Sequence, residues 1–168
     1  ETTTMALVPQ VVDAVKIPVI AAGGIADGRG IAAAFMLGAE AVQMGTRFVA
    51  TEECHVHENY KQFLLKARDI DTRVTGRTTG HPVRTLRNPM TKEYLEKEAA
   101  GASFEELELL TLGGLRKAVV DGDVKTGSVM SGQIAGMVKD IPTCKDLMAR
   151  LMAETKETVR KNSFLAEE

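Results

Sequence analysis

Residues 17–48 read IPVIAAGGIADGRGIAAAFMLGAEAVQMGTRF, and this stretch decides the fold. It contains two short apolar runs, residues 19–22 and 41–44, and glycine follows each of them. Apolar runs without alternation are typical of parallel strands buried on both faces. The segment between them, 28–37, is rich in helix formers, and Asp27 is placed to cap its first turn. The stretch therefore predicts a strand–helix–strand unit with a glycine turn after each strand.

Glycines at the ends of consecutive parallel strands are typical of a phosphate-binding cradle. Backbone N–H groups bind a phosphate only where no side chain holds the anion away, which explains glycine at Gly23, Gly24 and Gly45. Thr46 adds a hydroxyl donor. In a (β/α)8 barrel, the loops after strands seven and eight often form such a site. We therefore predict phosphate binding, against the alternative of turn glycines in a sheet without a ligand.

The flanking segments predict further helices, loops and short strands. From periodicity and capping signals we expect helices over 7–16, with Pro9 in the first turn, over 52–67 and over 90–100. A further helix is expected to begin at a Ser103–Glu106 capping box and to be interrupted at Gly113 and Gly114. Residues 69–88 are expected to be irregular with one or two short strands, and residues 121–137 to form a return loop. Asp140 is expected to cap a last helix, with Pro142 near its start. The apolar stripe of that helix is expected to be core, and comprises Cys144, Leu147, Met148, Leu151, Met152, Thr155 and Val159.

The composition is that of a globular protein, with 44% apolar and 26% charged residues in a chain of 168. A net charge of -2 gives no general attraction to nucleic acid or to anionic membranes. No apolar run approaches the roughly 20 residues that span a bilayer. Cys54 and Cys144 lie far apart in the sequence and do not suggest a disulfide framework. A cytoplasmic protein is expected.

Residues 17–48 resemble the last two βα units of the 2-nitropropane dioxygenase-like flavoproteins, which include nitronate monooxygenases and flavin-dependent enoyl-[acyl-carrier-protein] reductases II. The resemblance implies an α/β fold, namely the C-terminal portion of a (β/α)8 TIM barrel plus a mainly helical smaller region. Residues 66–88 and 122–141 resemble the enoyl reductase branch more than simple nitronate oxidases. By resemblance, the FMN phosphate is held by residues of the two strand ends: Ala22, Gly23, Gly24, Gln43, Met44, Gly45 and Thr46.

The resemblance implies FMN-dependent reduction of trans-2-enoyl-acyl carrier protein, with NADH or NADPH as co-substrate. It also suggests a homodimer and a possible monovalent cation. One alternative is a nitronate monooxygenase, which has the same flavin site but uses oxygen as oxidant. A second alternative is a nucleotide-binding barrel of the inosine-monophosphate dehydrogenase kind. The Asp-Gly-Gly and the loop cysteine usual there are not matched by Ala22-Gly23-Gly24 and the MGTRF stretch.

The histidine implicated in catalysis in this family would lie upstream of residue 1, so no residue of this chain is named as catalytic. A complete barrel takes about 250 residues. We therefore expect the C-terminal part of a larger protein, with the missing N-terminal half as a partner and no activity alone; an inert truncated or proteolytic fragment is the alternative. The expected division is 1–50 for the last βα units, 51–125 for a lid-like region, and 126–168 for the return loop and last helix.

Other candidate residues carry weaker signals. His81 is placed by the resemblance near the substrate, with a turn histidine as the alternative, and Gln133 is expected to approach the flavin. Cys54, His55 and His57 would need further ligands and a closing geometry to hold a metal, so no metal site is predicted. A basic stretch is either an anion surface, for a dinucleotide phosphate or an acidic acyl carrier protein, or a solvated face; it comprises Arg68, Arg73, Arg77, Arg84 and Arg87.

Overall fold

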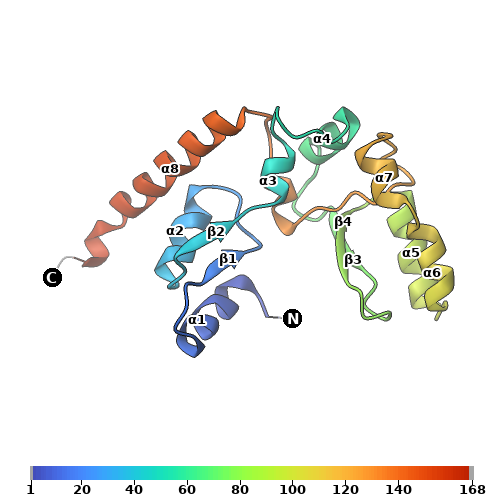
Figure 1. Ribbon diagram of the computed structural model, residues 1–168, viewed down its shortest axis with the longest axis horizontal. Helices are drawn as coiled ribbons and strands as arrows, with labels where there is room; N and C mark the ends of the chain where they lie inside the picture. The colour runs from blue at the N-terminus through green and yellow to red at the C-terminus, as the bar shows by residue number, and fades with distance from the viewer. Residues whose placement is uncertain (1, 167–168) are drawn as a thin grey trace.

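The computed structural model describes residues 2–166 and shows an α/β chain in two parts joined by a return segment (Figure 1). The elements, in chain order, are α1 Thr4–Ala14, β1 Ile20–Ala22, α2 Gly28–Met36, β2 Ala41–Gln43, α3 Thr46–Val49, α4 Glu58–Leu65, β3 Thr72–Thr75, β4 Val83–Leu86, α5 Pro89–Ala99, α6 Phe104–Thr111, α7 Gly114–Val119, the 3-10 helix η1 Gln133–Met137, α8 Cys144–Lys161 and the 3-10 helix η2 Ser163–Ala166. No helix in this described range is long and apolar enough to cross a membrane.

The strand–helix–strand unit is confirmed. β1 and β2 pair in parallel, with Ile20 opposite Ala41. The Asp27 carboxylate caps α2 by accepting hydrogen bonds from the amides of Arg29 (3.0 Å) and Gly30 (3.2 Å). These bonds satisfy amides that have no partner within the helix. The local sequence signals therefore place the two strand ends side by side.

The expected burial of β1 on both faces is wrong. Ala21 is 2% exposed, whereas Ile20 is 61% exposed. Ala21 packs into an apolar cluster with residues of α1, α2 and α8, such as Val8, Ile31 and Leu147. Side chains alternate between the faces of a strand, so Ile20 points to the opposite face, which the described residues do not cover.

Helix α1 begins earlier than expected, at Thr4 instead of Leu7, so Pro9 lies inside the helix and not in its first turn. Proline lacks the N–H that would bond to the carbonyl four residues earlier, here that of Met5. Met5 is 68% exposed, so water can reach that end of the helix and satisfy the carbonyl. Exposure explains why the helix passes through a residue that normally interrupts it.

Helix α8 packs along α2 through one narrow face. The Gly28 amide donates to Glu154 Oε2 at 3.0 Å, and a Cβ at Gly28 would lie 2.4 Å from the Glu154 Cβ. The expected cap is wrong, because Thr143 caps α8 and Asp140 lies before it. The expected core stripe is correct only in part: Leu147, Leu151 and Thr155 are buried, whereas Met148, Met152 and Val159 are exposed.

The second part of the chain is built on a β-hairpin. β3 and β4 are antiparallel, with Thr72 opposite Leu86, which confirms short strands within residues 69–88. Helices α5, α6 and α7 lie beside the hairpin (Figure 1). The Ser103–Glu106 capping box of α6 is confirmed.

Helix α4 is shorter than expected because it begins at Glu58 and not at Glu52. His57 caps it, since the His57 Nδ1 accepts a hydrogen bond of 3.0 Å from the Asn59 amide. A cap fixes where a helix begins, and sequence periodicity alone did not locate this one. Residues 52–57 instead form a short turn at 52–53 followed by irregular chain.

Candidate phosphate site and adjoining pocket

The first wall of the candidate phosphate site follows β1. Gly23 has a φ of 95° and Gly24 a φ of 76°, a left-handed conformation that is costly for other residues. Ala22, Gly23 and Gly24 are all exposed. The Thr4 hydroxyl donates to the Gly23 carbonyl at 3.0 Å, so the start of α1 holds this turn in place. The turn therefore presents bare backbone at the end of the strand.

The second wall follows β2, where Gly45 precedes α3. Gly45 has an ordinary φ of -95°, and a Cβ built there meets nothing within 4 Å. Neither its backbone nor the packing of the described residues therefore requires glycine. Glycine at this position keeps the space beyond the strand end open, which is the property a phosphate cradle needs. The residues present thus fit a phosphate-bearing group.

Thr46 connects the cradle to a segment far along the chain. Its Oγ1 accepts a hydrogen bond of 2.8 Å from the Gly132 amide. Because the oxygen accepts this bond, the hydroxyl hydrogen points away from Gly132. It is the one hydrogen that the Thr46 side chain can donate to an anion. Gln133, next in sequence, is exposed at the start of η1. The structure therefore brings Gly132 to the cradle, while an approach of Gln133 to the flavin stays a prediction.

The remaining predicted cradle residues lie beside these walls. Gln43 is exposed at the end of β2. Met44 is half-buried and packs against the apolar cluster under β1 and α2, so its backbone faces the cradle more readily than its side chain. The assignment of both to a cofactor stays a prediction.

The return segment, residues 129–132, also hydrogen-bonds to the hairpin. The Leu86 amide donates to the Val129 carbonyl at 2.8 Å, and the Ser131 amide donates to the Arg84 carbonyl at 3.0 Å. One short segment therefore joins β4 to Thr46. A sequence pattern could not show this connection, because its partners lie more than forty residues away along the chain.

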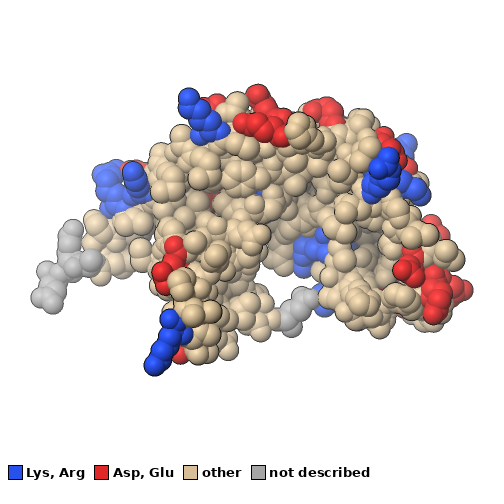
Figure 2. All heavy atoms as spheres, in the orientation of Figure 1, with Lys and Arg blue, Asp and Glu red and all other residues tan. Residues whose placement is uncertain are grey.

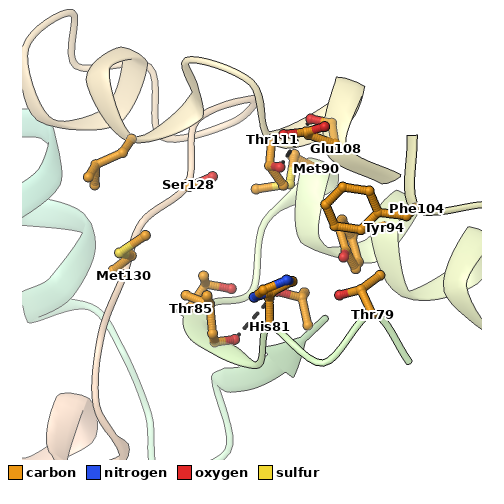
Figure 3. Close-up of a pocket in the computed structure, with 13 residues that line it drawn as sticks. Thr79, His81, Thr85, Met90, Tyr94, Phe104, Glu108, Thr111, Ser128 and Met130 are labelled. Atoms are coloured by element: carbon orange, nitrogen blue, oxygen red, sulfur yellow. Dashed lines mark hydrogen bonds between the residues drawn. The ribbon is translucent and has the colours of Figure 1, made fainter. Parts of the chain in front are cut away.

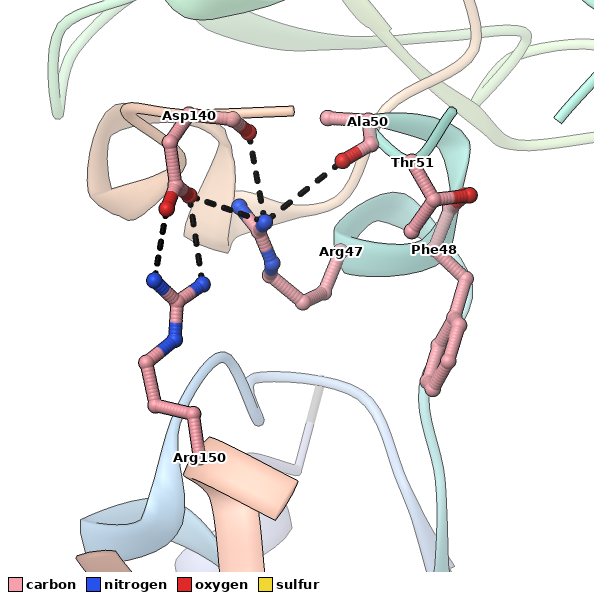
Figure 4. Close-up of polar contacts among 6 residues, drawn as sticks. All are labelled: Arg47, Phe48, Ala50, Thr51, Asp140 and Arg150. Atoms are coloured by element: carbon pink, nitrogen blue, oxygen red, sulfur yellow. Dashed lines mark hydrogen bonds and ion pairs between the residues drawn. The ribbon is translucent and has the colours of Figure 1, made fainter. Parts of the chain in front are cut away.

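Arg47, within the MGTRF stretch, does not face the cradle. Its guanidinium is 4% exposed and donates to Asp140 Oδ1 at 2.9 Å and to the Asp140 carbonyl at 3.2 Å (Figure 4). Arg150 holds the other side of the same carboxylate, and its hydrogen bonds keep the pKa of Asp140 below the ordinary value. Burial lowers the pKa of Arg47, and the attraction of Asp140 opposes this. Asp140 thus joins α3 to α8, which is the structural role it has instead of capping.

His81 lies at the rim of a pocket of about 410 Å³ between the hairpin and helices α5–α7 (Figure 3). Its ring is 5.9 Å from the ring of Phe104, with the planes tilted by 54°. Thr85, Met90 and Tyr94 form buried parts of the lining. His81 lies on the pocket rim and also ends the hairpin turn, where its amide donates to the Gly76 carbonyl at 3.0 Å. A role toward substrate stays a prediction.

The CHVH stretch has a local role in helix capping, as described for His57. In the part of the chain that the structure describes, no group of three or more His, Cys, Asp or Glu residues could hold a metal ion.

The basic stretch makes many intramolecular contacts. Arg68 pairs with Asp71 at 3.0 Å, Arg73 donates to two carbonyls, and Arg84 donates to the Thr72 hydroxyl at 3.1 Å. Charges of both signs are spread over the face in Figure 2, which also shows a hollow between the part that holds β1 and the hairpin. The anion-surface hypothesis is not tested by these contacts and stays a prediction.

Comparison with known proteins identifies the class of this fold. The chain superposes on FabK from Thermotoga maritima with a TM-score of 0.90 and 52% identity, covering 96% of this chain and 51% of that one. It is also similar to a nitroalkane oxidase from Streptomyces ansochromogenes, with a TM-score of 0.76 and 33% identity over 94% of this chain and 45% of that one. These likenesses confirm the expected fold class, part of a (β/α)8 barrel with a mainly helical smaller region.

The family follows from the sequence comparison. Residues 1–154 match the family model of nitronate monooxygenase, and the chain belongs to this family of flavin-dependent oxidoreductases. A probable nitronate monooxygenase from Staphylococcus saprophyticus is 38% identical over 136 residues, which is 81% of this chain and 38% of that protein. An indene-carboxyl-CoA dehydrogenase from Mycobacterium tuberculosis is 33% identical over an alignment of 208 positions, gaps included, which covers 98% of this chain and 58% of that protein. The chain thus spans about half the length of the relatives it matches.

Proposed function

We propose that this chain forms the phosphate-binding and substrate-facing part of an FMN-dependent enoyl-acyl carrier protein reductase. The observation that carries the proposal is the similarity to FabK, an enoyl-acyl carrier protein reductase II. Its 52% identity and TM-score of 0.90 exceed the 33% and 0.76 of the nitroalkane oxidase. The similarity to a dehydrogenase named for a CoA thioester agrees with a thioester substrate.

In this proposal the residues of the chain bind and orient. The backbone at Gly23, Gly24 and Gly45 and the hydroxyl of Thr46 hold the phosphate of FMN, with Ala22, Gln43, Met44 and Gln133 beside it. When bound, FMN supplies hydride transfer between NADH or NADPH and the enoyl β-carbon. The turn at Gly23 is held by Thr4, and Thr46 is held by Gly132, so the phosphate meets an arranged set of donors.

The partners of this function are part of the proposal. The substrate is carried on acyl carrier protein, and the rest of the flavin site is provided by barrel strands from the N-terminal half of the same protein. A homodimer is proposed by resemblance, and so are a monovalent cation and a cytoplasmic location. The alternative is that the chain is an inert fragment, which predicts no flavin binding whether or not these partners are present.

A second candidate function is nitronate oxidation with oxygen, which the family match and the staphylococcal relatives favour. The assembled flavoprotein distinguishes the two. We expect anaerobic oxidation of NADH or NADPH by a trans-2-enoyl thioester, and little oxygen-dependent consumption of an alkyl nitronate. Turnover of the nitronate without turnover of the thioester would contradict the reductase proposal.

A further inference from the structure

The pocket between the hairpin and helices α5–α7 lacks an assigned ligand. Its volume of about 410 Å³ falls within the range of roughly 300–1,000 Å³ that is usual for small-molecule sites. Its floor is buried and includes Met90 and Tyr94. Its rim carries large apolar side chains that are markedly exposed: Phe104 at 46%, Leu115 at 44% and Met130 at 41%. An open pocket with an apolar rim is suited to a ligand that covers these side chains.

The charges of the lining limit the kind of ligand. None of the described lining residues is a lysine or an arginine, and Glu108 lies among them. A phosphate or carboxylate in this pocket would therefore meet a like charge with no lysine or arginine beside it. The other polar groups of the lining are threonine hydroxyls and the side chains of His81, Tyr94 and Ser128. Some of the threonines already hydrogen-bond within the chain: Thr85 pairs with Thr91, and Thr111 donates to the Glu108 carbonyl. The lining favours an uncharged, mainly apolar ligand.

The pocket lies close to the phosphate cradle through Met130. Met130 forms an isolated β-bridge with Thr85, so it lies directly beside β4. It precedes by two residues Gly132, whose amide is bonded to Thr46. Two residues of extended chain span at most about 7 Å. The Met130 wall of the pocket is therefore a short distance from the residues that hold the phosphate.

We propose that this pocket binds the distal part of the acyl chain of a thioester substrate, which enters past Met130. The inference rests on the proposed function and adds where the substrate's chain is held. The pocket then contributes to affinity in proportion to the apolar surface that the acyl chain buries against Met90, Leu115 and Met130. Long enoyl groups are expected to bind and short ones to bind weakly.

Methionine methyl groups provide the test in the protein of this sequence. Met90 and Met130 line the pocket, whereas Met36, Met148 and Met152 lie exposed elsewhere. The probe is the N-acetylcysteamine thioester of trans-2-decenoic acid, and methyl NMR of 13C-methionine protein follows its binding. We expect shifts of the Met90 and Met130 methyls and none at the other three. Equal shifts at all five, which would report adsorption to the surface, or none at Met90 and Met130 would overturn the proposal.

A matched pair of variants gives a second, independent readout. Leu115→Trp fills the pocket, and Leu112→Trp makes the same change at a neighbouring residue that is 68% exposed and outside the lining. We expect L115W to weaken binding of the decenoyl probe about tenfold or more, equivalent to ~1.4 kcal/mol, and L112W to leave it unchanged. Equal affinity in both variants would contradict the proposal, and so would a crotonyl probe that binds the unsubstituted protein as tightly as the decenoyl one.

The outcome is separable from that of the proposed function. FMN binding is followed separately, by flavin absorbance. Decenoyl-dependent shifts at Met90 together with no reductase activity of the assembled flavoprotein would support the pocket and contradict the reductase. Reductase activity of the assembled flavoprotein without these shifts would do the reverse.

Discussion

The amide of Gly132 donates a 2.8 Å hydrogen bond to Thr46 Oγ1, and this contact joins the return segment to the strand end that carries the phosphate cradle. Thr46→Val keeps the shape of the side chain but removes the acceptor. The half-buried Gly132 amide then lacks a partner, and we expect the free energy of unfolding to fall by about 1 kcal/mol. Urea unfolding measures this loss. Thr46→Ser retains the hydroxyl as the control, and equal stability of the two variants would show that the bond contributes nothing.

The glycines of the cradle are expected to respond differently to the same substitution. Gly23 has a φ of 95°, so Gly23→Ala should lower stability by about 1–2 kcal/mol. Gly45 has an ordinary φ and free space around a Cβ, so Gly45→Ala should change stability by less than about 0.5 kcal/mol. Both should weaken retention of FMN in the assembled flavoprotein, because each methyl group enters the space of the phosphate.

Gly80→Ala is the control for backbone strain without a ligand. Gly80 also has a positive φ, 77°, with nothing near its Cβ, but it lies in the hairpin turn away from the cradle. It should lose stability as Gly23→Ala does and keep FMN. If G45A retained FMN as well as G80A, the glycine at position 45 would have no part in phosphate binding.

The sequence predicted the strand, the glycine turn and the helix start of residues 20–36 well because their signals are local. A strand end, a glycine turn and an Asp27 cap lie within a few residues of one another, and each has its own conformational requirement. The same local logic failed at Asp140, since Thr143 is an equally good cap and is placed closer to the helix. Asp140 is instead held by Arg47, 93 residues earlier, and by Arg150. Only the folded chain brings these charges together.

Exposure also depends on tertiary structure. The apolar run ending at Ala22 predicted a strand covered on both faces, yet Ile20 is exposed because the described helices pack on one face only. In the same way, the apolar stripe of α8 predicts a helix, but it does not show how many of its side chains are covered by the rest of the fold. α2 and α8 pack closely at Gly28, and their contact is too narrow to cover Met148 and Met152, which stay exposed to solvent.

Removing the charge of Asp140 tests the connection between α3 and α8. Asp140→Asn leaves the buried Arg47 guanidinium without an ionic partner, and we expect a loss of about 1.5–3 kcal/mol in thermal or urea unfolding. Arg150→Met should cost less, because the Arg47–Asp140 contact remains. A larger loss for R150M than for D140N would contradict this role for Arg47.

The same carboxylate should make stability depend on acidity. Hydrogen bonds from Arg150 lower the pKa of folded Asp140 below the ordinary value of an aspartate, 3.8, so the folded state favours the charged form. The stabilising contribution is therefore complete above that value and is lost as the pH falls through the lower pKa of the folded state. Unfolding measured from pH 5 downward should show a smaller decline in D140N than in the unsubstituted protein. Parallel declines would exclude this contribution.

The contact between α2 and α8 is expected to be intolerant of added volume. In Gly28→Ala the new Cβ would lie 2.4 Å from both the Glu154 Cβ and the Thr155 amide nitrogen, so α8 must move. We expect a loss of about 1–3 kcal/mol, as for other overpacked contacts. Gly30→Ala is the control, since its nearest atoms are Ile25 Cγ2 at 3.3 Å and Ile25 Cα at 3.4 Å, which requires a shift of only a few tenths of an ångström. Similar stability of G28A and G30A would mean that α8 is not held against α2 in solution.

The isolated chain is expected to bind FMN weakly. Gly23, Gly24 and Gly45 are exposed, and β1 and β2 form a sheet of two strands in the described structure, so water competes for the same donors. Phosphate contacts alone then oppose the cost of immobilising the cofactor, and we expect a Kd above about 100 μM, corresponding to a binding free energy weaker than ~5.5 kcal/mol. Titration followed by flavin fluorescence measures it, with FabK from Thermotoga maritima as the positive control. Stoichiometric binding at low micromolar FMN would show that this chain forms a sufficient flavin site by itself, and the proposal that other barrel strands complete the site would fail.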